Sequence, residues 1–306
     1  STPLYSSAAS DVYKRQIYHQ KGIITAFKEA GYQTAFFSNQ RYNHSFIDFF
    51  GKEADTFDFI KEDSLDSAYN PSDDELLALV AKELSKGNQK QFIVLHTYGS
   101  HFNYRERYPS EDAFFLPDYP VEAEVKYRDN LVNAYDNTIR YTDSFLSRLI
   151  HMLEEQHVDA AMLYTSDHGE DIFDDSRHLF LHASPVPSYY QLHVPFLIWM
   201  SDTYREAYPE HWQTVTKNKD KDLSSSRSFF PTMLELGGVQ TSYRNDSSSV
   251  VSPLYTMKPR VYLNDHNEPR PLDDLGMKQP DFQKCQVLGI KYYVCLLYTS
   301  PSPRDS

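Results

Sequence analysis

The chain has 306 residues, of which 40% are hydrophobic and 15% aromatic, enough apolar material for one substantial core. Its formal net charge is −13, and an acidic chain repels phosphate backbones, so we expect no nucleic-acid partner. No apolar run in the sequence reaches the roughly 18 residues of a membrane helix, so none is predicted within it.

The two ends of the chain differ in character from the rest. Residues 6–16 (SSAASDVYKRQ) and 295–305 (CLLYTSPSPRD) match in-frame translations of the two strands of one transposase sequencing adaptor. A Ser- and Pro-rich disordered tail at each end is the alternative interpretation. We therefore treat residues 1–16 and 295–306 as adaptor-like, disordered ends, and expect residues 17–294 to be a genuine segment cut at both ends.

Helix-like and strand-like segments alternate in the first third of the chain. The helical pattern of Gly22–Ala30 ends at Gly31, a residue suited to the turn after a helix. The apolar run Thr34–Ser38 predicts a buried strand. Pro71–Leu84 has acidic residues in its first turn and predicts a helix, and Phe92–His96 (FIVLH) predicts a second buried strand.

The alternation continues toward the C-terminus. Val121–Glu155 carries a long helical periodicity. Apolar runs predict further strands at Ala160–Thr165 and Val194–Met200, and a helix closed by two glycines is predicted over Ser226–Leu236. Late short strands are predicted at Val261–Asn264 and Tyr292–Val294.

Strands that alternate with helices favour an α/β fold with a mostly parallel sheet sandwiched between helices. In such sheets, ligands bind beyond the carboxyl ends of the strands. Polar residues gather at those ends, since Ser38–Gln40, His96–His101 and Ser166–Glu170 each follow a predicted strand. The sequence therefore predicts a functional site at that edge of the sheet.

The strongest chemical signal is the Asp167-His168 pair. A carboxylate and an imidazole at a strand end can ligate one divalent ion where the chain turns sharply, and Gly169 permits that turn. Asp, His and Gly also favour ordinary surface turns, which is the simpler interpretation of the pair alone. The wider run LYTSDHGED strengthens the metal interpretation.

Two further histidines are candidates: His101 lies just past the predicted strand Phe92–His96, and His182 lies between the Ser166–Glu170 run and the predicted strand at Val194. His101 in LHTYGSH and His182 in LFLHASP would reach the same rim, although each alone is more often a surface histidine. Imidazoles there can bind phosphoryl oxygens, protonate a leaving group or ligate a second ion. The sequence has no Walker-type phosphate loop, no Gly-x-Ser-x-Gly elbow and no Cys-x-x-Cys, so other common chemistries fit less well.

At these residues the chain resembles the phosphoethanolamine transferases of the alkaline-phosphatase and sulfatase superfamily. Ser-Asp-His-Gly-Glu is shared across the superfamily, whereas GSH combined with LH-x-x-P points to the transferase branch. The resemblance implies an alkaline-phosphatase-like fold with its N-terminal part missing, and a partial sulfatase-like catalytic domain over residues 17–294. The matching stretches, in family order, are GYQTAFFSNQ, FIVLHTYGSH, YDNTIRYTDSFLSRLI, LYTSDHGED, LFLHASP and HVPFLIWM.

The resemblance also implies roles for individual residues. Asp167 and His168 would ligate zinc, in a site of one or two ions. His101 and His182 would be catalytic residues that line the phosphoryl site. The family nucleophile is a threonine upstream of GYQTAFFSNQ, where this chain has adaptor-like sequence. Nearby supporting residues would be Glu170, Ser166 and Asn39.

A complete parent would move phosphoethanolamine from a phosphatidylethanolamine donor to lipid A or a cell-surface glycan, through a phospho-threonine intermediate. The resemblance places it in the bacterial inner membrane, with its catalytic domain facing the periplasm and membrane contact through the missing N-terminal region. Without the nucleophile, we expect this chain to be inactive.

Two other interpretations compete with the transferase. The first is a sulfatase or another metal-dependent phosphodiesterase of the same superfamily. The second is a binding module that kept the fold and lost the chemistry. The intact Asp-His pair and the two flanking histidines argue against a binding module.

Overall fold

The structure is a computed structural model with an α/β fold. The predicted strand Tyr292–Val294 and both adaptor-like ends lie outside its described residues. The described residues are 22–40, 46–60, 70–87, 90–182, 186–263, 269–271 and 276–289.

A three-stranded parallel sheet forms the first half of the fold. Strand β1 (Gln33–Ser38) lies between β2 (Thr56–Phe59) and β3 (Gln91–His96), in the order β2-β1-β3. Ser38 pairs with Phe59 on one side and with His96 on the other. The strands predicted from apolar runs are confirmed as β1 and β3, whereas β2 was not predicted.

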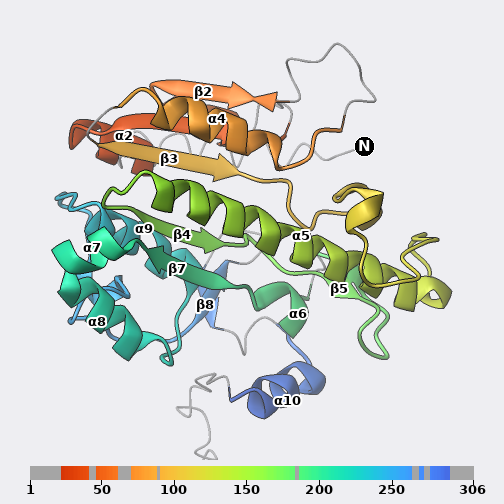
Figure 1. Ribbon diagram of the computed structural model, residues 1–306. Coiled ribbons are helices and arrows are strands. Elements are labelled where there is room, and N and C mark those ends of the chain that lie inside the picture. Colours follow the sequence, from red (N-terminus) through yellow and green to blue (C-terminus); the bar gives the residue numbers. More distant parts are fainter. Residues whose placement is uncertain are drawn as a thin grey trace, which may run out of the picture.

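Helices cover both faces of this sheet (Figure 1). Helices α2 (Ile23–Glu29) and α9 (Ser225–Leu236) pack on one face, where Phe27 stacks on Phe92 with ring centroids 3.8 Å apart. Helices α4 (Glu75–Leu84) and α5 (Arg128–Glu155) pack on the other. The predicted sandwich of a sheet between helices is therefore confirmed.

Helix α5 begins later than its sequence pattern suggests. Residues Val125–Tyr127 form a 3-10 turn, and the α-helix starts at Arg128 rather than at Val121. Val121 is buried in a small cluster with Leu131, so its apolar character reflects packing of the preceding loop. Within the described part of the chain, no helix is both long and apolar enough to cross a membrane.

The second sheet consists of β4 (Ala161–Thr165) and β7 (Phe196–Met200), which run antiparallel. Thr165 pairs with Phe196 at the end of β4. Strand β7 begins two residues after the predicted start because Pro195 has no N–H for the ladder. Helices α7 (Asp202–Ala207) and α8 (Pro209–Asn218) follow β7.

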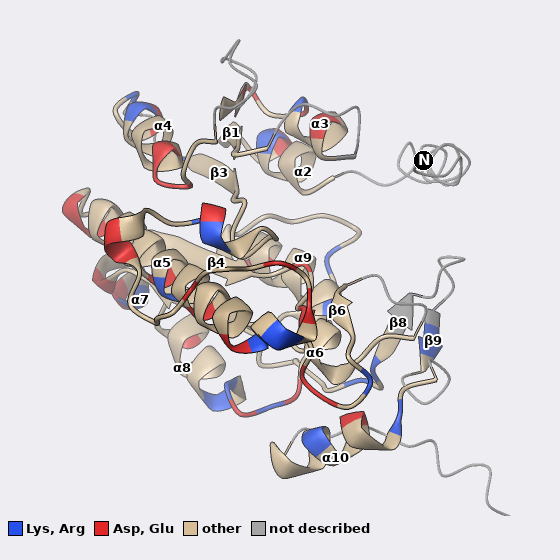
Figure 2. Ribbon diagram, turned by 90° about the vertical axis from the view of Figure 1, so that its right-hand side faces the viewer, with Lys and Arg blue, Asp and Glu red and all other residues tan. Residues whose placement is uncertain are grey.

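Short elements complete the described fold, and Figure 2 shows that acidic and basic residues are spread over many of its elements. The predicted late strand near Val261 is confirmed as β8. The short elements are α3 (Phe46–Gly51), η2 (Tyr104–Glu106), η3 (Ser110–Asp112), η4 (Val125–Tyr127), β5 (Asp171–Ile172), β6 (Phe180–Leu181), α6 (Tyr189–Leu192), η5 (Asp246–Ser248), β8 (Val261–Leu263), β9 (Pro269–Pro271) and α10 (Gln279–Val287).

Candidate metal centre

Three side chains meet beyond the end of β4. The potential ligand atoms of His168, Glu170 and His182 all lie within 4.8 Å of one another. The two imidazole centroids are 3.7 Å apart, and Oε1 of Glu170 lies 3.2 Å from Nδ1 of His182. Ligand atoms around a tetrahedral zinc ion are roughly 3.3 Å apart, and two imidazoles with a carboxylate are a zinc-binding set. The donors present therefore fit a zinc ion.

A tight turn and a hairpin bring the three residues together. His168 and Glu170 follow β4, and the β5–β6 hairpin then returns the chain to His182. Between the first two, the N–H of Gly169 donates to a carbonyl of α6 at 2.9 Å. A Cβ atom at Gly169 would lie 2.1 Å from the carbonyl oxygen of Tyr190, so this approach requires glycine.

Glu170 is the most enclosed member of the group. Its side chain is 4% exposed, whereas that of His182 is 35% exposed. The hydroxyl of Tyr104, from η2, donates to Oε2 of Glu170. Burial, and then the charge of Glu170, raise the pKa of Tyr104, so the phenol stays protonated and remains a donor. Tyr104 therefore fixes the orientation of the carboxylate.

Asp167 and Ser166 shape the turn. The Asp167 side chain is 86% exposed, and its Oδ2 lies 3.8 Å from Nε2 of His168. Its Oδ1 accepts the N–H of His168 at 3.0 Å, while the hydroxyl of Ser166 donates to the carbonyl of His168 at 2.6 Å. The structure thus groups His168 with Glu170 and His182, and the ligand role of Asp167 stays a prediction.

His101 lies on the wall of a large cavity beside this group. Its ring is exposed and packs edge-on against Tyr98 at 5.1 Å between centroids. Asp167, His168 and Glu170 line the same cavity. The structure therefore places His101 near the group but not among its three members, and the catalytic role of His101 stays a prediction.

Asn39 acts on the loop that carries His101. It is buried, and its Nδ2 donates to Oδ1 of Asp73 at 2.8 Å. The same Asp73 accepts the N–H groups of Tyr98 and Gly99 at 2.8 and 2.9 Å. Asn39 thus supports the candidate site through Asp73, a residue that sequence reasoning did not select.

The cavity separates β3 from β4. It measures about 1800 Å³, and every residue of both strands lines it. Strand β3 is an edge strand of the first sheet, and β4 pairs with β7 in the second. The edge of each strand that faces the cavity therefore has no strand partner among the described residues. Burial lowers the pKa of His96, at the end of β3, while Asp167 and Asp73 act in the opposite sense. The carboxyl ends of β3 and β4 therefore share one rim, as predicted.

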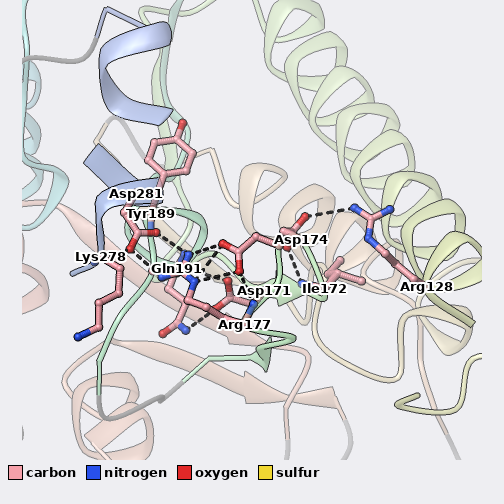
Figure 3. Close-up of polar contacts among 11 residues, drawn as sticks. Arg128, Asp171, Ile172, Asp174, Arg177, Tyr189, Gln191, Lys278 and Asp281 are labelled. Carbon is pink, nitrogen blue, oxygen red and sulfur yellow. Dashed lines mark hydrogen bonds and ion pairs between the residues drawn. The ribbon is translucent and has the colours of Figure 1, made fainter. Parts of the chain in front are cut away.

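A charged network ties the loop of the β5–β6 hairpin to helix α10 (Figure 3). Nη1 and Nη2 of Arg177 donate to the two carboxylate oxygens of Asp281 at 2.7 and 2.8 Å, and Nε donates to Asp175 at 2.9 Å. Asp281, in α10, is 1% exposed and also accepts the backbone N–H groups of Tyr189 and Lys278. Burial acts to raise the pKa of Asp281, but Arg177 and these N–H groups hold it below its ordinary value.

Asp171 ties the first strand of the hairpin to α6. Its carboxylate accepts hydrogen bonds from the Ser188 hydroxyl at 2.7 Å and the Gln191 amide at 2.5 Å. Burial raises the pKa of Asp171, and these two hydrogen bonds act against that shift. We call the whole network the brace, and its members are Asp171, Asp175, Arg177, Ser188, Gln191 and Asp281.

The brace holds a backbone with unusual conformations. Phe173, His178 and Leu181 have φ angles of 54°, 51° and 65°, in the left-handed region that side chains disfavour. Such conformations persist where surrounding contacts fix them, and they gather at functional sites. Leu181 directly precedes His182, so the strained segment ends next to one of the three residues that could hold a metal ion.

Sequence reasoning missed Tyr104 and the brace. Arg177 and Asp281 lie 104 positions apart, and a single sequence offers no signal that joins them. Asp281 gave one local signal, because Pro280 and an acidic third position mark the start of a helix. That signal predicts α10 but not the partner of Asp281.

Comparison with known proteins identifies the family. The Sulfatase family model matches residues 2–239. Phosphoethanolamine transferase EptA of Salmonella typhimurium is 35% identical over 168 residues, which cover 53% of this chain and 30% of that protein. The Kdo(2)-lipid A phosphoethanolamine 7''-transferase of Escherichia coli is 36% identical over 159 residues, 50% of this chain and 27% of that protein. The chain thus spans about three tenths of the length of these relatives.

Solved structures agree on the fold. The C-terminal periplasmic domain of EptC from Escherichia coli, in complex with Zn, superposes with a TM-score of 0.75 at 22% identity, over 86% of this chain and 74% of that one. The integral membrane protein EptA from Neisseria meningitidis gives a TM-score of 0.67 at 26% identity, over 76% of this chain and 44% of that one. The chain therefore belongs to the sulfatase family, within an alkaline-phosphatase-like fold whose matched relatives are phosphoethanolamine transferases.

Proposed function

We propose that the chain is part of a zinc-dependent phosphoethanolamine transferase, with residues 17–294 as its catalytic portion. The parent would take phosphoethanolamine from phosphatidylethanolamine and pass it to a phosphate of lipid A or of a cell-surface glycan. One observation carries the proposal: a sulfatase-family fold places His168, Glu170 and His182 within 4.8 Å of one another at the rim of a large cavity. The names of the relatives supply the transferred group.

We propose the following roles for the residues of this chain. His168, Glu170 and His182 would hold a zinc ion, and the exposed carboxylate of Asp167 is close enough to His168 to join by a side-chain rotation. Zinc bound there would neutralise charge on the transferring phosphoryl group and lower the pKa of the attacking hydroxyl. His101, on the cavity wall, would bind a phosphoryl oxygen or supply the proton for the leaving group.

The attacking group would come from outside this chain. We propose a threonine, phosphorylated in the course of the reaction, at the end of a strand that fills the cavity between β3 and β4. Two apolar strands border that cavity with open edges, and a parallel strand placed there would give their backbone groups partners. Its carboxyl end would emerge at the rim beside Asp167 and His168. The parent would sit in the bacterial inner membrane with this site facing the periplasm.

Zinc titration tests the metal assignment. The chain competes for zinc with a chromophoric chelator, and we expect His168→Ala, Glu170→Gln and His182→Ala each to weaken binding by roughly 10- to 100-fold. His151→Ala is the matched control, because this histidine is on α5 and its side chain is 74% exposed. Equal affinity in all four variants and the wild type would overturn the proposed centre.

Turnover tests the transferase assignment. With a fluorescent phosphatidylethanolamine donor, we expect no release of diacylglycerol by this chain alone, because the proposed threonine would come from outside it. The Escherichia coli EptC domain, which spans more of the fold, serves as the positive control. Turnover by the chain at the rate of that control would contradict the proposed position of the nucleophile. Hydrolysis of an aryl sulfate by the chain would instead favour the sulfatase alternative.

A further inference from the structure

The loop before α5 exposes apolar side chains while its backbone is held firmly. The side chains of Phe114, Leu116 and Tyr119 are 63%, 66% and 68% exposed. Phe115, at 37%, packs edge-on against Phe114 with ring centroids 5.0 Å apart. We call Phe114, Phe115, Leu116 and Tyr119 the apolar loop. A contiguous exposed patch of this kind marks an interaction surface more often than a single exposed residue does.

Three asparagines on one face of α5 hold the backbone of this loop. Oδ1 of Asn137 accepts the N–H groups of Phe114 and Phe115, both at 2.9 Å, and its Nδ2 donates to the carbonyl of Phe115 at 3.0 Å. Asn133 donates to the carbonyl of Pro117 at 2.9 Å. Asn130 donates to Pro120 at 3.2 Å in the same way. The backbone is therefore satisfied internally, which leaves the apolar side chains to point outward.

Buried charge fixes the far side of the loop. Asp118 is 8% exposed, accepts the hydroxyl of Tyr108 at 2.8 Å and pairs with Nε of Arg105 at 3.0 Å. The guanidinium of Arg140 lies 4.5 Å from the centre of the Phe114 ring. A loop fixed from both sides would not refold to bury Phe114 and Leu116 within the domain.

The same stretch of α5 also contacts the segments that hold the candidate site. Thr138, next to Asn137, donates to the hydroxyl of Ser100 at 2.7 Å, and Ser100 precedes His101. Tyr135, one turn away, packs on Tyr104 with centroids 5.2 Å apart, and Tyr104 holds Glu170. In Figure 1 the first turns of α5 lie at the same end of the molecule as β5. The apolar loop and the site are thus attached rigidly to one helix.

We propose that the apolar loop inserts into the surface of a zwitterionic, phosphatidylethanolamine-rich lipid bilayer and so brings the metal centre to its substrates. The inference rests on the proposed function, in which donor and acceptor are lipids that a site in the aqueous phase must reach. Residues 111–124 contain no lysine or arginine and carry five acidic residues, while nearby Lys126 pairs with Glu124 and Arg140 lies over the Phe114 ring. Attraction to anionic headgroups is therefore not the main source of the contact. Aromatic and leucine side chains at the interface supply the attraction instead.

Vesicle flotation of the full chain tests this contact. The chain is mixed with vesicles of phosphatidylethanolamine and phosphatidylcholine, and we expect the double variant Phe114→Ser, Leu116→Ser to lower the partition coefficient at least about tenfold. Leu254→Ser is the matched control, because Leu254 is 63% exposed, as Phe114 is. Added anionic lipid should weaken binding of the wild-type chain. An equal loss in the control, or binding only to anionic vesicles, would overturn the proposal.

A local readout separates the apolar loop from other apolar surfaces, including the cavity. In the Leu116→Trp variant, lipids brominated on their acyl chains should quench the fluorescence of the new tryptophan, and its emission should shift to the blue. The tryptophan of Leu254→Trp should show neither change. An unquenched Trp at position 116 on bound vesicles would overturn the proposal. Loss of a dimer in sedimentation of the double variant, with flotation unchanged, would assign the loop to a second copy instead.

Zinc titration of the double variant keeps the two proposals apart. We expect unchanged zinc affinity, because the metal group and its Tyr104 contact do not involve these two side chains. If zinc affinity is intact and flotation is lost, both proposals stand. If the chain binds no zinc but still floats through Leu116, the proposed function fails and the lipid contact survives.

Discussion

The two flanks of the metal centre differ in how completely their polar groups are paired. On the brace side, the carboxylate of Asp281 is 1% exposed and accepts hydrogen bonds from Arg177, Tyr189 and Lys278. On the cavity side, β3 and β4 face about 1800 Å³ of space with edges that have no strand partner among the described residues. Among the described residues, polar groups are therefore paired on the brace side of the candidate site, whereas strand edges lack partners on the cavity side.

This difference shows which part of the site each flank supplies. The brace fixes the hairpin from Glu170 to His182, so the three side chains that could hold a metal ion are brought together by contacts within this chain. His101 lies on the wall of the cavity and outside the group of three, although its neighbour Phe102 packs on Phe180 of the hairpin with ring centroids 5.3 Å apart. We infer that metal binding requires the brace, whereas turnover requires whatever fills the cavity.

Breaking the Arg177–Asp281 pair should have the largest effect on stability. Asp281→Ala leaves the Arg177 guanidinium, 19% exposed, with Asp175 alone, and it removes the acceptor of the Tyr189 and Lys278 N–H groups. Breaking a buried network of this kind costs about 3–5 kcal/mol. We expect the free energy of unfolding, measured in urea, to fall by that amount. Zinc affinity should fall with it, because the hairpin that carries His182 loses its support.

An exposed ion pair provides the control for this prediction. Asp202→Ala removes the partner of Arg205, where the two side chains are 83% and 38% exposed, and such pairs contribute about 0–1 kcal/mol. Equal losses in Asp281→Ala and Asp202→Ala would contradict the view that the brace is a buried, cooperative network.

A methyl group at Gly169 should have the next largest effect. Gly169→Ala places a Cβ atom 2.1 Å from the carbonyl oxygen of Tyr190, so either α6 or the turn must move. Overpacking of this kind costs about 1–3 kcal/mol, and zinc affinity should drop because Gly169 lies between His168 and Glu170. Gly87→Ala is the control: its φ is +67°, but no atom lies within 4 Å of the added Cβ. A larger loss of zinc affinity in the control would contradict the steric argument.

Much of the strand placement was predictable from the sequence, because these strands are short, continuous apolar runs bounded by polar residues. Thr34–Ser38, Phe92–His96 and Ala160–Thr165 lie within one residue of β1, β3 and β4. Strand β2 was missed because Thr56–Phe59 is four residues long and carries an aspartate.

The site was predictable only in part. His168 was predicted as a ligand from its position after a strand, whereas the resemblance implied a catalytic role for His182 and a supporting one for Glu170. The potential ligand atoms of the three residues lie within 4.8 Å of one another. The pairing of Asp167 with His168 as ligands stays a prediction: the Asp167 side chain is 86% exposed, and its Oδ2 lies 3.8 Å from Nε2 of His168. Contacts such as Arg177–Asp281 depend on how distant segments pack, which local sequence patterns do not encode.

Amide exchange should show the cavity directly. In β1, which pairs on both edges, we expect exchange at the rate set by global unfolding. About half of the amides of β3 and β4 point toward the cavity and should exchange at least about tenfold faster. Protease digestion and mass spectrometry of residues 33–38, 91–96 and 161–165 would measure this. Equal protection of all three segments would show that the two edges are already closed.

The smallest expected effect is the pH dependence of the brace. The pKa of Asp281 is lowered in the folded chain, so below its ordinary value, near 3.9, the unfolded chain binds a proton that the folded chain does not. Its contribution to the free energy of unfolding is therefore complete above about pH 5 and is lost as pH falls through the folded pKa. Each unit of lowering corresponds to about 1.4 kcal/mol.

Comparison of two asparagine variants isolates this effect. Asp281→Asn cannot ionise, so its deficit relative to the wild type should be constant from pH 7 to pH 5 and should shrink toward pH 3 in urea titrations. Asp171 has a raised pKa, so ionisation of this carboxyl opposes folding, and the deficit of Asp171→Asn should instead grow as pH falls through that pKa. Parallel pH profiles for the two variants would contradict the assignment of opposite shifts, because only opposite shifts give stability changes of opposite sign.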